Sequence, residues 1–335
     1  MIEYRYLGNT GIKVSVIGVG TWQWGSRCWG YGKQYTDRDL IEAFKKAVEH
    51  GVNFFDTAEI YGDGRSEEIL GRCLSMVERE EIVVATKFSP MRITEKSIVK
   101  ALESSLKRLK TNYIDLYQVH WPNPLLPIPK AMKILEKMWE NGKIRTIGVC
   151  NFNLRQLEEA RNVLSRTDVV SNQIEYDMLK RDPEKKMIDY CIREKITIIA
   201  YSPLAQGALT GKYTSKNKPR DPIRILNPYF TSKRLEKLQL LVEKLREIGE
   251  KHGKSVVQVV LSWVTRWPNV VAIPGVKRVE HVLDIVGAAG LKLSDDELKI
   301  IEAELEKLSS GRLTWIVNLL KNYLAIKLSE KKLEE

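Results

Sequence analysis

Eight short apolar runs alternate with amphipathic stretches along most of this chain. The runs predict strands at residues 16–20, 53–57, 82–87, 113–119, 145–150, 169–174, 197–202 and 270–274. The stretches between them predict helices at residues 38–50, 66–76, 94–109, 130–141, 154–164, 184–194 and 255–267. Eight strands joined by helical crossovers indicate an α/β fold, a closed (β/α)8 barrel rather than an open sheet. No Gly-x-Gly-x-x-Gly follows the first run, so a dinucleotide-binding open sheet has little support.

Two segments lie outside this rhythm. Residues 1–15 alternate around Asn-Thr-Gly and predict a small β-hairpin. Residues 204–254 form a long connection with a basic loop at 216–228 and a helix near 231–252. Loops that follow barrel strands carry ligand sites, so we expect this connection to cover a cofactor or a substrate.

The C-terminal end predicts a helix at 294–309 and then a tail at 311–335. The tail carries an apolar stripe that favours a helix packed on the barrel. A homo-oligomer contact and a membrane-surface helix are the alternatives. We therefore divide the chain into a barrel domain, residues 1–310, and a helical tail, residues 311–335.

Bulk properties exclude several classes of protein. No apolar run is long enough to span a membrane, and the N-terminus lacks the apolar core of a signal peptide. The four cysteines are scattered without a Cys-x-x-Cys, which argues against a metal site and favours reduced thiols in the cytoplasm. A net charge of +11 would suit a nucleic-acid partner, but Lys and Glu interleave and no nucleic-acid-binding signature occurs. An ion-pair-rich solvated surface explains the charge.

Three consecutive predicted strands end in different ionisable residues. Asp56 ends one apolar run, Lys87 ends the next, and His120 ends the third, while Tyr61 follows five positions after Asp56. Strand alternation lets the three side chains point inward at one rim of the barrel. An ammonium beside a phenol lowers the phenol pKa, so we expect Tyr61 to be acidified. Such a tyrosine can protonate a carbonyl oxygen as hydride arrives, while a histidine orients the same oxygen.

These motifs resemble a known family. Asp-Thr-Ala-x-x-Tyr-Gly begins at Asp56, Gln-x-His-Trp-Pro surrounds His120, and residues 1–305 as a whole are similar to the aldo-keto reductases, notably the branch with potassium-channel β-subunits. The resemblance implies an NADPH-dependent oxidoreductase that reduces aldehydes and ketones to alcohols. It implies that Tyr61 is the general acid, that Lys87 and Asp56 tune it, and that His120 orients the carbonyl.

The same resemblance implies a nicotinamide cofactor site. Asn151 and Gln173 would hold the carboxamide, Tyr201 would stack on the nicotinamide, and Cys150 replaces the family's usual serine. The other residues expected to contact the cofactor are Gly20, Thr21, Trp22, Asp56, Ser202, Pro203, Leu204, Gln206, Gly207, Lys212, Ile273, Gly275, Val276 and His281.

Lys277 and Arg278 follow the eighth run, where the family meets the adenosine 2′-phosphate. Two cations there favour NADP(H), with NAD(H) as the alternative, and an ordinary basic turn is the plainer explanation. We expect no metal cofactor.

The first loop is dense in aromatic residues. Trp22, Trp24 and Trp29, together with Trp121, are expected to wall an apolar pocket for a small carbonyl substrate, although packing of the barrel mouth would explain them equally well.

Two other functions remain open at this point. Some members of the family act as nucleotide-sensing partners of ion channels, which would make this chain a binding subunit. A Schiff-base aldolase that uses Lys87 is the other alternative.

Overall fold

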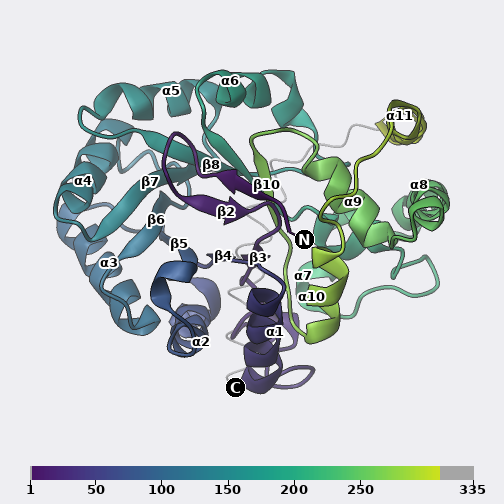
Figure 1. Ribbon diagram of the computed structural model, residues 1–335, viewed down its shortest axis with the longest axis horizontal. Coiled ribbons are helices and arrows are strands. Elements are labelled where there is room, and N and C mark those ends of the chain that lie inside the picture. The colour runs from purple at the N-terminus through teal and green to yellow at the C-terminus, as the bar shows by residue number, and fades with distance from the viewer. Residues whose placement is uncertain (1, 310–335) are drawn as a thin grey trace.

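The computed structural model describes residues 2–309, and its centre is a ring of eight parallel strands. Neighbours in the ring follow the order of the chain. The strands are β3 (Val19–Gly20), β4 (Phe54–Asp56), β5 (Val83–Phe88), β6 (Ile114–Val119), β7 (Ile144–Cys150), β8 (Val169–Glu175), β9 (Thr197–Tyr201) and β10 (Val270–Ile273). Helices surround the ring, as Figure 1 shows, and the predicted (β/α)8 barrel is confirmed.

The ring closes between its last strand and its first through a short seam. Isolated bridges pair Ile17 with Ala272 and Gly20 with Gly275. The amide of Ala272 donates to the carbonyl of Val16 at 2.9 Å. Each of the remaining pairs of neighbouring strands is joined by a ladder, with one register shift between β7 and β8, so this seam is the thinnest join in the barrel.

The strands are apolar along their length because both of their faces are covered. Every residue of β5 and β6 is buried. Side chains on one face fill the barrel interior, and those on the other face pack under the helices. The interior cluster includes Phe54, Val83, Ala85, Leu116, Ile199 and Val271.

The N-terminal hairpin closes one end of the barrel. It consists of β1 (Tyr4–Tyr6) and β2 (Lys13–Ser15), which pair antiparallel as predicted. Leu7 and Val14 are fully buried and join the interior cluster, and in Figure 1 the hairpin crosses the centre of the ring. Gly8 adopts φ +58°, and a Cβ there would lie 2.6 Å from the carbonyl oxygen of Val170. Any chemistry must therefore occur at the opposite end, where the strands end.

The helices confirm most of the sequence-based expectations. Those that cover the strands are α1 (Asp37–Glu49), α2 (Arg65–Leu74), α3 (Glu95–Leu109), α4 (Ile128–Glu140), α5 (Leu154–Val163), α6 (Met187–Arg193), α9 (Val256–Val264) and α10 (Val279–Val286). Capping boxes at Thr94, Asn153 and Ser255 define three of the starts. The helix predicted at 184–194 begins later, because Lys186 has φ −152° and residues before it form a 3-10 turn.

The connection after β9 is built from short helices and one long helix. It contains α7 (Pro222–Ile225) and α8 (Ser232–His252), and α8 packs against α11 (Asp295–Ser309) at the side of the barrel (Figure 1). Among residues 2–309, no helix combines the length and apolarity that crossing a membrane requires. The tail at 311–335, with its predicted helix and oligomer contact, lies outside the described residues.

Candidate active site

The structure brings the four predicted catalytic side chains together at the open end of the barrel. Asp56 is the last residue of β4, Lys87 lies near the end of β5, and His120 directly follows β6. Tyr61 begins a 3-10 turn after β4. Its hydroxyl lies 3.4 Å from the Nζ of Lys87, and its ring meets the His120 ring edge-on at 5.7 Å between centroids.

Lys87 and Asp56 form a fully buried ion pair. Lys87 Nζ donates to Asp56 Oδ1 at 2.5 Å and to the carbonyl of Thr57 at 2.9 Å. Burial works to lower the pKa of Lys87, but the charge of Asp56 and its hydrogen bond, together with Tyr61 and Cys150, outweigh it, so the pKa is raised. The ammonium is therefore charged at neutral pH, and its donors are directed at Asp56, Thr57 and Tyr61.

Two amide side chains complete the environment of the Asp56 carboxylate. Gln173 Nε2 donates to Asp56 Oδ2 at 2.8 Å, and Gln118 Nε2 donates to the same oxygen at 3.1 Å. Gln118 Oε1 accepts from Cys150 Sγ at 3.4 Å. Gln118 was not among our predicted site residues. Its sequence position could have identified it, because it is a buried polar residue two positions before His120 and so lies on the same face of the strand. It links the carboxylate to the strand that carries Cys150.

The pKa of Tyr61 corrects one expectation. We expected the neighbouring ammonium to lower it, but burial raises the pKa of Tyr61 to about 12, with Lys87 opposing the rise and Asp56 and Cys150 adding to it. Desolvation of the phenolate outweighs the attraction of a single ammonium that is itself paired. Tyr61 is therefore a phenol with its proton in place at neutral pH.

His120 is neutral. Burial and the nearby Lys87 charge hold the pKa of His120 well below its ordinary value. Its Nδ1 is buried and has no hydrogen-bond partner among residues 2–309. A neutral imidazole beside a phenol can hydrogen-bond a polar ligand without adding charge.

The predicted cofactor residues lie on the other strands of the ring. Asn151 follows β7, Gln173 lies in β8, and Tyr201 ends β9. Tyr201 Oη donates to Asn151 Oδ1 at 2.9 Å, and Asn151 Nδ2 donates to the carbonyl of His120 at 3.3 Å. Gly20 and Gly275 meet at the seam. These residues therefore line the same end of the barrel as Tyr61.

Strained backbone marks this second region. Asn151, Ser202, Ala205 and Gln206 have φ of 61°, 52°, 49° and 55°, in the left-handed region that non-glycine residues seldom adopt. Such conformations cost of order 1 kcal/mol or more each and cluster at ligand sites. Three of the four are predicted cofactor residues, and the fourth lies between Leu204 and Gln206.

Cations gather beyond β10. Burial, together with the charges of Arg224, Lys212 and Arg278, lowers the pKa of Lys277 to about 8, while the charge of Asp221 opposes the shift. Lys277 Nζ donates to the carbonyl of Trp29 at 2.7 Å. Positive side chains that repel one another are stabilised by an anion, so this donor set fits a phosphate group.

The four predicted substrate-facing tryptophans separate into two pairs. Trp24 and Trp29 are 0% and 1% exposed, and Trp24 Nε1 donates to the carbonyl of Val276 at 2.9 Å. Their packing role leaves no surface for a substrate, which corrects that expectation. Trp22 and Trp121 are partly exposed and remain candidates.

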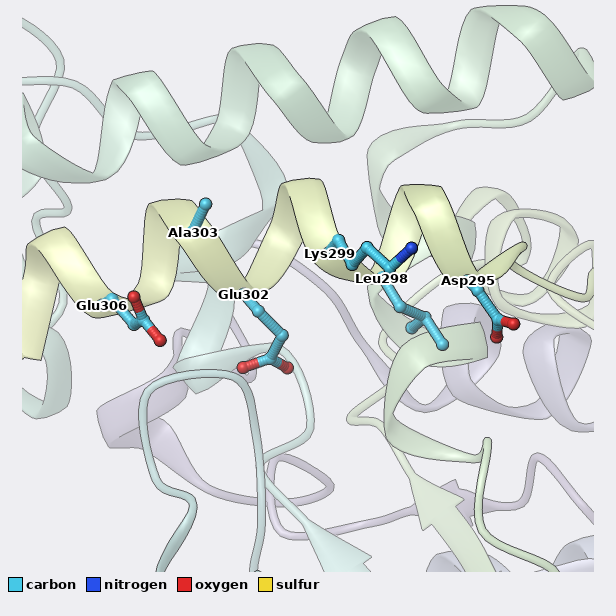
Figure 2. Close-up of a pocket in the computed structure, with 6 residues that line it drawn as sticks. All are labelled: Asp295, Leu298, Lys299, Glu302, Ala303 and Glu306. Carbon is cyan, nitrogen blue, oxygen red and sulfur yellow. The ribbon is translucent and has the colours of Figure 1, made fainter.

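A hollow of about 470 Å³ lies along α11, away from the ends of the strands. Figure 2 shows its six lining residues on one helix, with Leu298 and Glu302 pointing to one side and Ala303 to the other. No strained backbone or unpartnered buried polar atom accompanies it within residues 2–309. The same part of the chain holds no group of three His, Cys, Asp or Glu residues able to bind a metal ion.

Comparison with known proteins decides the family. A family model described as "Aldo/keto reductase family" matches residues 16–306. The chain belongs to this family. Members are oxidoreductases that use nicotinamide cofactors, so the predicted enzyme class and type of cofactor are confirmed.

The similarity to individual relatives extends over most of this chain. An uncharacterized oxidoreductase of Mycobacterium tuberculosis is 40% identical over 312 residues, which is 92% of this chain and 96% of the relative. The chloroplastic pyridoxal reductase of Arabidopsis thaliana is 37% identical, covering 85% and 82%. The crystal structure of an aldo/keto reductase from Klebsiella pneumoniae in complex with NADP and acetate superposes with a TM-score of 0.73 at 27% identity, covering 93% and 98%.

Proposed function

We propose that this protein reduces aldehydes or ketones to alcohols with NADPH, and that Tyr61 is the proton donor. One observation carries the proposal: a protonated tyrosine lies 3.4 Å from a buried ammonium, beside a neutral histidine at the mouth of the barrel. A phenol with its proton in place suits a general acid.

The chemistry divides between the cofactor and the protein. A bound NADPH supplies a hydride to the carbonyl carbon. Tyr61 Oη gives its proton to the carbonyl oxygen, and the O–H bond of the phenol breaks as that of the alcohol forms. Lys87 stabilises the phenolate that remains, and water returns the proton. His120 hydrogen-bonds the carbonyl oxygen before and during the transfer.

The assignment of a nicotinamide cofactor is supported by two amides, and its preference for NADPH rests on the cation cluster. Asn151 and Gln173 carry both donors and acceptors, which a carboxamide needs. Lys277 and Arg278 supply charge for a 2′-phosphate, and the NADP complex of the K. pneumoniae relative supports that choice. Trp22 and Trp121 are proposed to contact the substrate.

Two measurements test the proposal: a fluorescence titration with NADPH, and an assay of turnover with small aldehydes. Tyr61→Phe should lower kcat by roughly 10³-fold, because the general acid is lost, and should leave the Kd for NADPH unchanged. Retained turnover would remove Tyr61 from the mechanism.

Two other results would replace the proposal. NADPH binding without oxidation across a broad aldehyde panel would favour the nucleotide-sensing role. Borohydride trapping of a substrate on Lys87 would favour an aldolase, although a protonated and fully engaged ammonium is a poor nucleophile.

A further inference from the structure

The segment between Asp56 and Tyr61 continues the sheet beyond the end of β4. The amide of Thr57 donates to the carbonyl of Ala85 at 2.8 Å, and the amide of Glu59 donates to the carbonyl of Lys87 at 3.2 Å. The loop that carries the tyrosine is therefore attached directly to the strand that carries the lysine.

The side chain of Glu59 strengthens this attachment. It is buried and accepts from the amide of Ser89 at 2.6 Å, from Arg92 Nε at 3.1 Å and from Arg92 Nη2 at 2.8 Å. Ser89 and Arg92 both lie in the loop that follows β5. Bidentate, charge-assisted bonds of this kind are among the strongest that side chains form and fix geometry as well as energy.

A further contact extends the attachment to the loop after β6. Asn123 Nδ2 donates to the carbonyl of Pro90 at 2.5 Å. The loops that follow β4, β5 and β6 are thus joined in series, and these are the three strands that position Asp56, Lys87 and His120.

We propose that Glu59 and Arg92 are positioning residues for Tyr61, because their ion pair fixes the distance between the Tyr61 hydroxyl and Lys87 Nζ. This inference rests on the proposed function, since it concerns the same proton donor. Glu59 lies two residues before Tyr61, and the amide of Tyr61 donates to the carbonyl of Ala58 at 3.1 Å, so a shift of Glu59 moves the phenol with it.

A second ion pair in the barrel offers a control. Arg145 Nη1 meets Asp115 Oδ1 at 2.7 Å, and Asp115 also accepts from the amide of Val84 in the neighbouring strand and pairs with Arg79 Nη2 at 2.7 Å. The two arginine side chains are similarly exposed, 37% for Arg92 and 47% for Arg145, and both carboxylates are buried. Asp115 lies at the start of β6, at the end of the barrel away from Tyr61.

Arg92→Ala is the first test, and its half-exposed side chain makes a folded variant the expected product. We expect kcat for aldehyde reduction to fall by roughly 10- to 100-fold, because small displacements of a catalytic group are that damaging. The KM for the aldehyde and the Kd for NADPH should stay unchanged, since neither depends on the phenol. Arg92→Lys should recover part of kcat, and Arg145→Ala should leave kcat unchanged.

The deciding test combines Arg92→Ala with Tyr61→Phe. If Arg92 acts through Tyr61, its removal should not lower the residual kcat of Tyr61→Phe any further. An equal proportional loss in both backgrounds, or an equal loss from Arg145→Ala, would overturn the inference and leave the proposed function standing. Full turnover by Tyr61→Phe alone would instead overturn the proposed function. Should Arg92→Ala fail to fold, Arg92→Lys in the same two backgrounds decides by the same criterion.

Discussion

The two halves of the barrel mouth are built differently. On β4, β5 and β6, Asp56 and Lys87 are almost completely buried, and protein groups surround both charges. On β7, β8, β9 and β10, the candidate residues include Asn151, Ser202 and Gln206 in left-handed conformations. Beyond β10, the charges of Arg224, Lys212 and Arg278 act on Lys277, and only part of their effect is offset by Asp221.

The difference shows which half needs a ligand. In the proton-donor half, protein groups hold the charges of Lys87 and Asp56 in place, which is the preorganisation that proton transfer requires. The cofactor half keeps strained backbone and like charges that a phosphate would relieve, so part of its stability should come from the ligand that it binds. Changes in the first half should therefore affect folding and kcat, and changes in the second should affect cofactor affinity.

The largest expected effect is that of Lys87→Met. It leaves the Asp56 carboxylate buried without its cation, which should lower the free energy of unfolding by roughly 3–5 kcal/mol. The double variant Lys87→Met/Asp56→Asn should recover part of that loss because no charge remains unpaired. Urea denaturation of both variants measures the difference. A single variant as stable as the double variant would show that this half is not held by its ion pair.

A smaller effect is expected from Lys277→Ala/Arg278→Ala. Loss of two charged hydrogen-bond donors should weaken NADPH at least tenfold and leave NADH nearly unchanged. Fluorescence titration with both nucleotides provides the measurement, and Lys130→Ala, at an exposed site on α4, is the control. Equal weakening of the two nucleotides would refute the assignment of the 2′-phosphate.

The smallest effect concerns His120 and pH. Because burial keeps His120 neutral in the fold, the unfolded chain takes up one more proton below an ordinary pKa of about 6.5, and stability falls as the pH falls. This group should therefore lower the free energy of unfolding at pH 5.5 and leave it unchanged at pH 8. His120→Gln should flatten that part of the pH dependence, measured by urea denaturation at pH 5.5 and pH 8.

Periodicity predicted the barrel because parallel strands buried on both faces are continuous apolar runs, and few other residues interrupt them. Alternation within those runs also placed Asp56, Lys87 and His120 at one rim. The start of α6 was missed because one residue, Lys186, leaves the helical conformation, and no local sequence signal marks it.

The errors at the site have a common physical origin. The sequence shows that Lys87 and Tyr61 are neighbours, but the pKa of Tyr61 depends on how deeply its hydroxyl is buried, which only the packed structure defines. Trp24 and Trp29 belong to the same aromatic loop as Trp22, and nothing in their spacing distinguishes a packed indole from an exposed one. Glu59 occupies one of the two unspecified positions of the Asp-Thr-Ala-x-x-Tyr-Gly motif, so the motif predicted no role for it.

The thin seam of the ring has a consequence for the whole molecule. The join that unites the beginning and the end of the cylinder holds Gly20 and Gly275, and the proposed phosphate-binding turn starts immediately after it. A dinucleotide bound there would contact both sides of this seam and hold the first and last strands of the ring together. Cofactor supply would then govern how long the folded enzyme lasts as well as how fast it works.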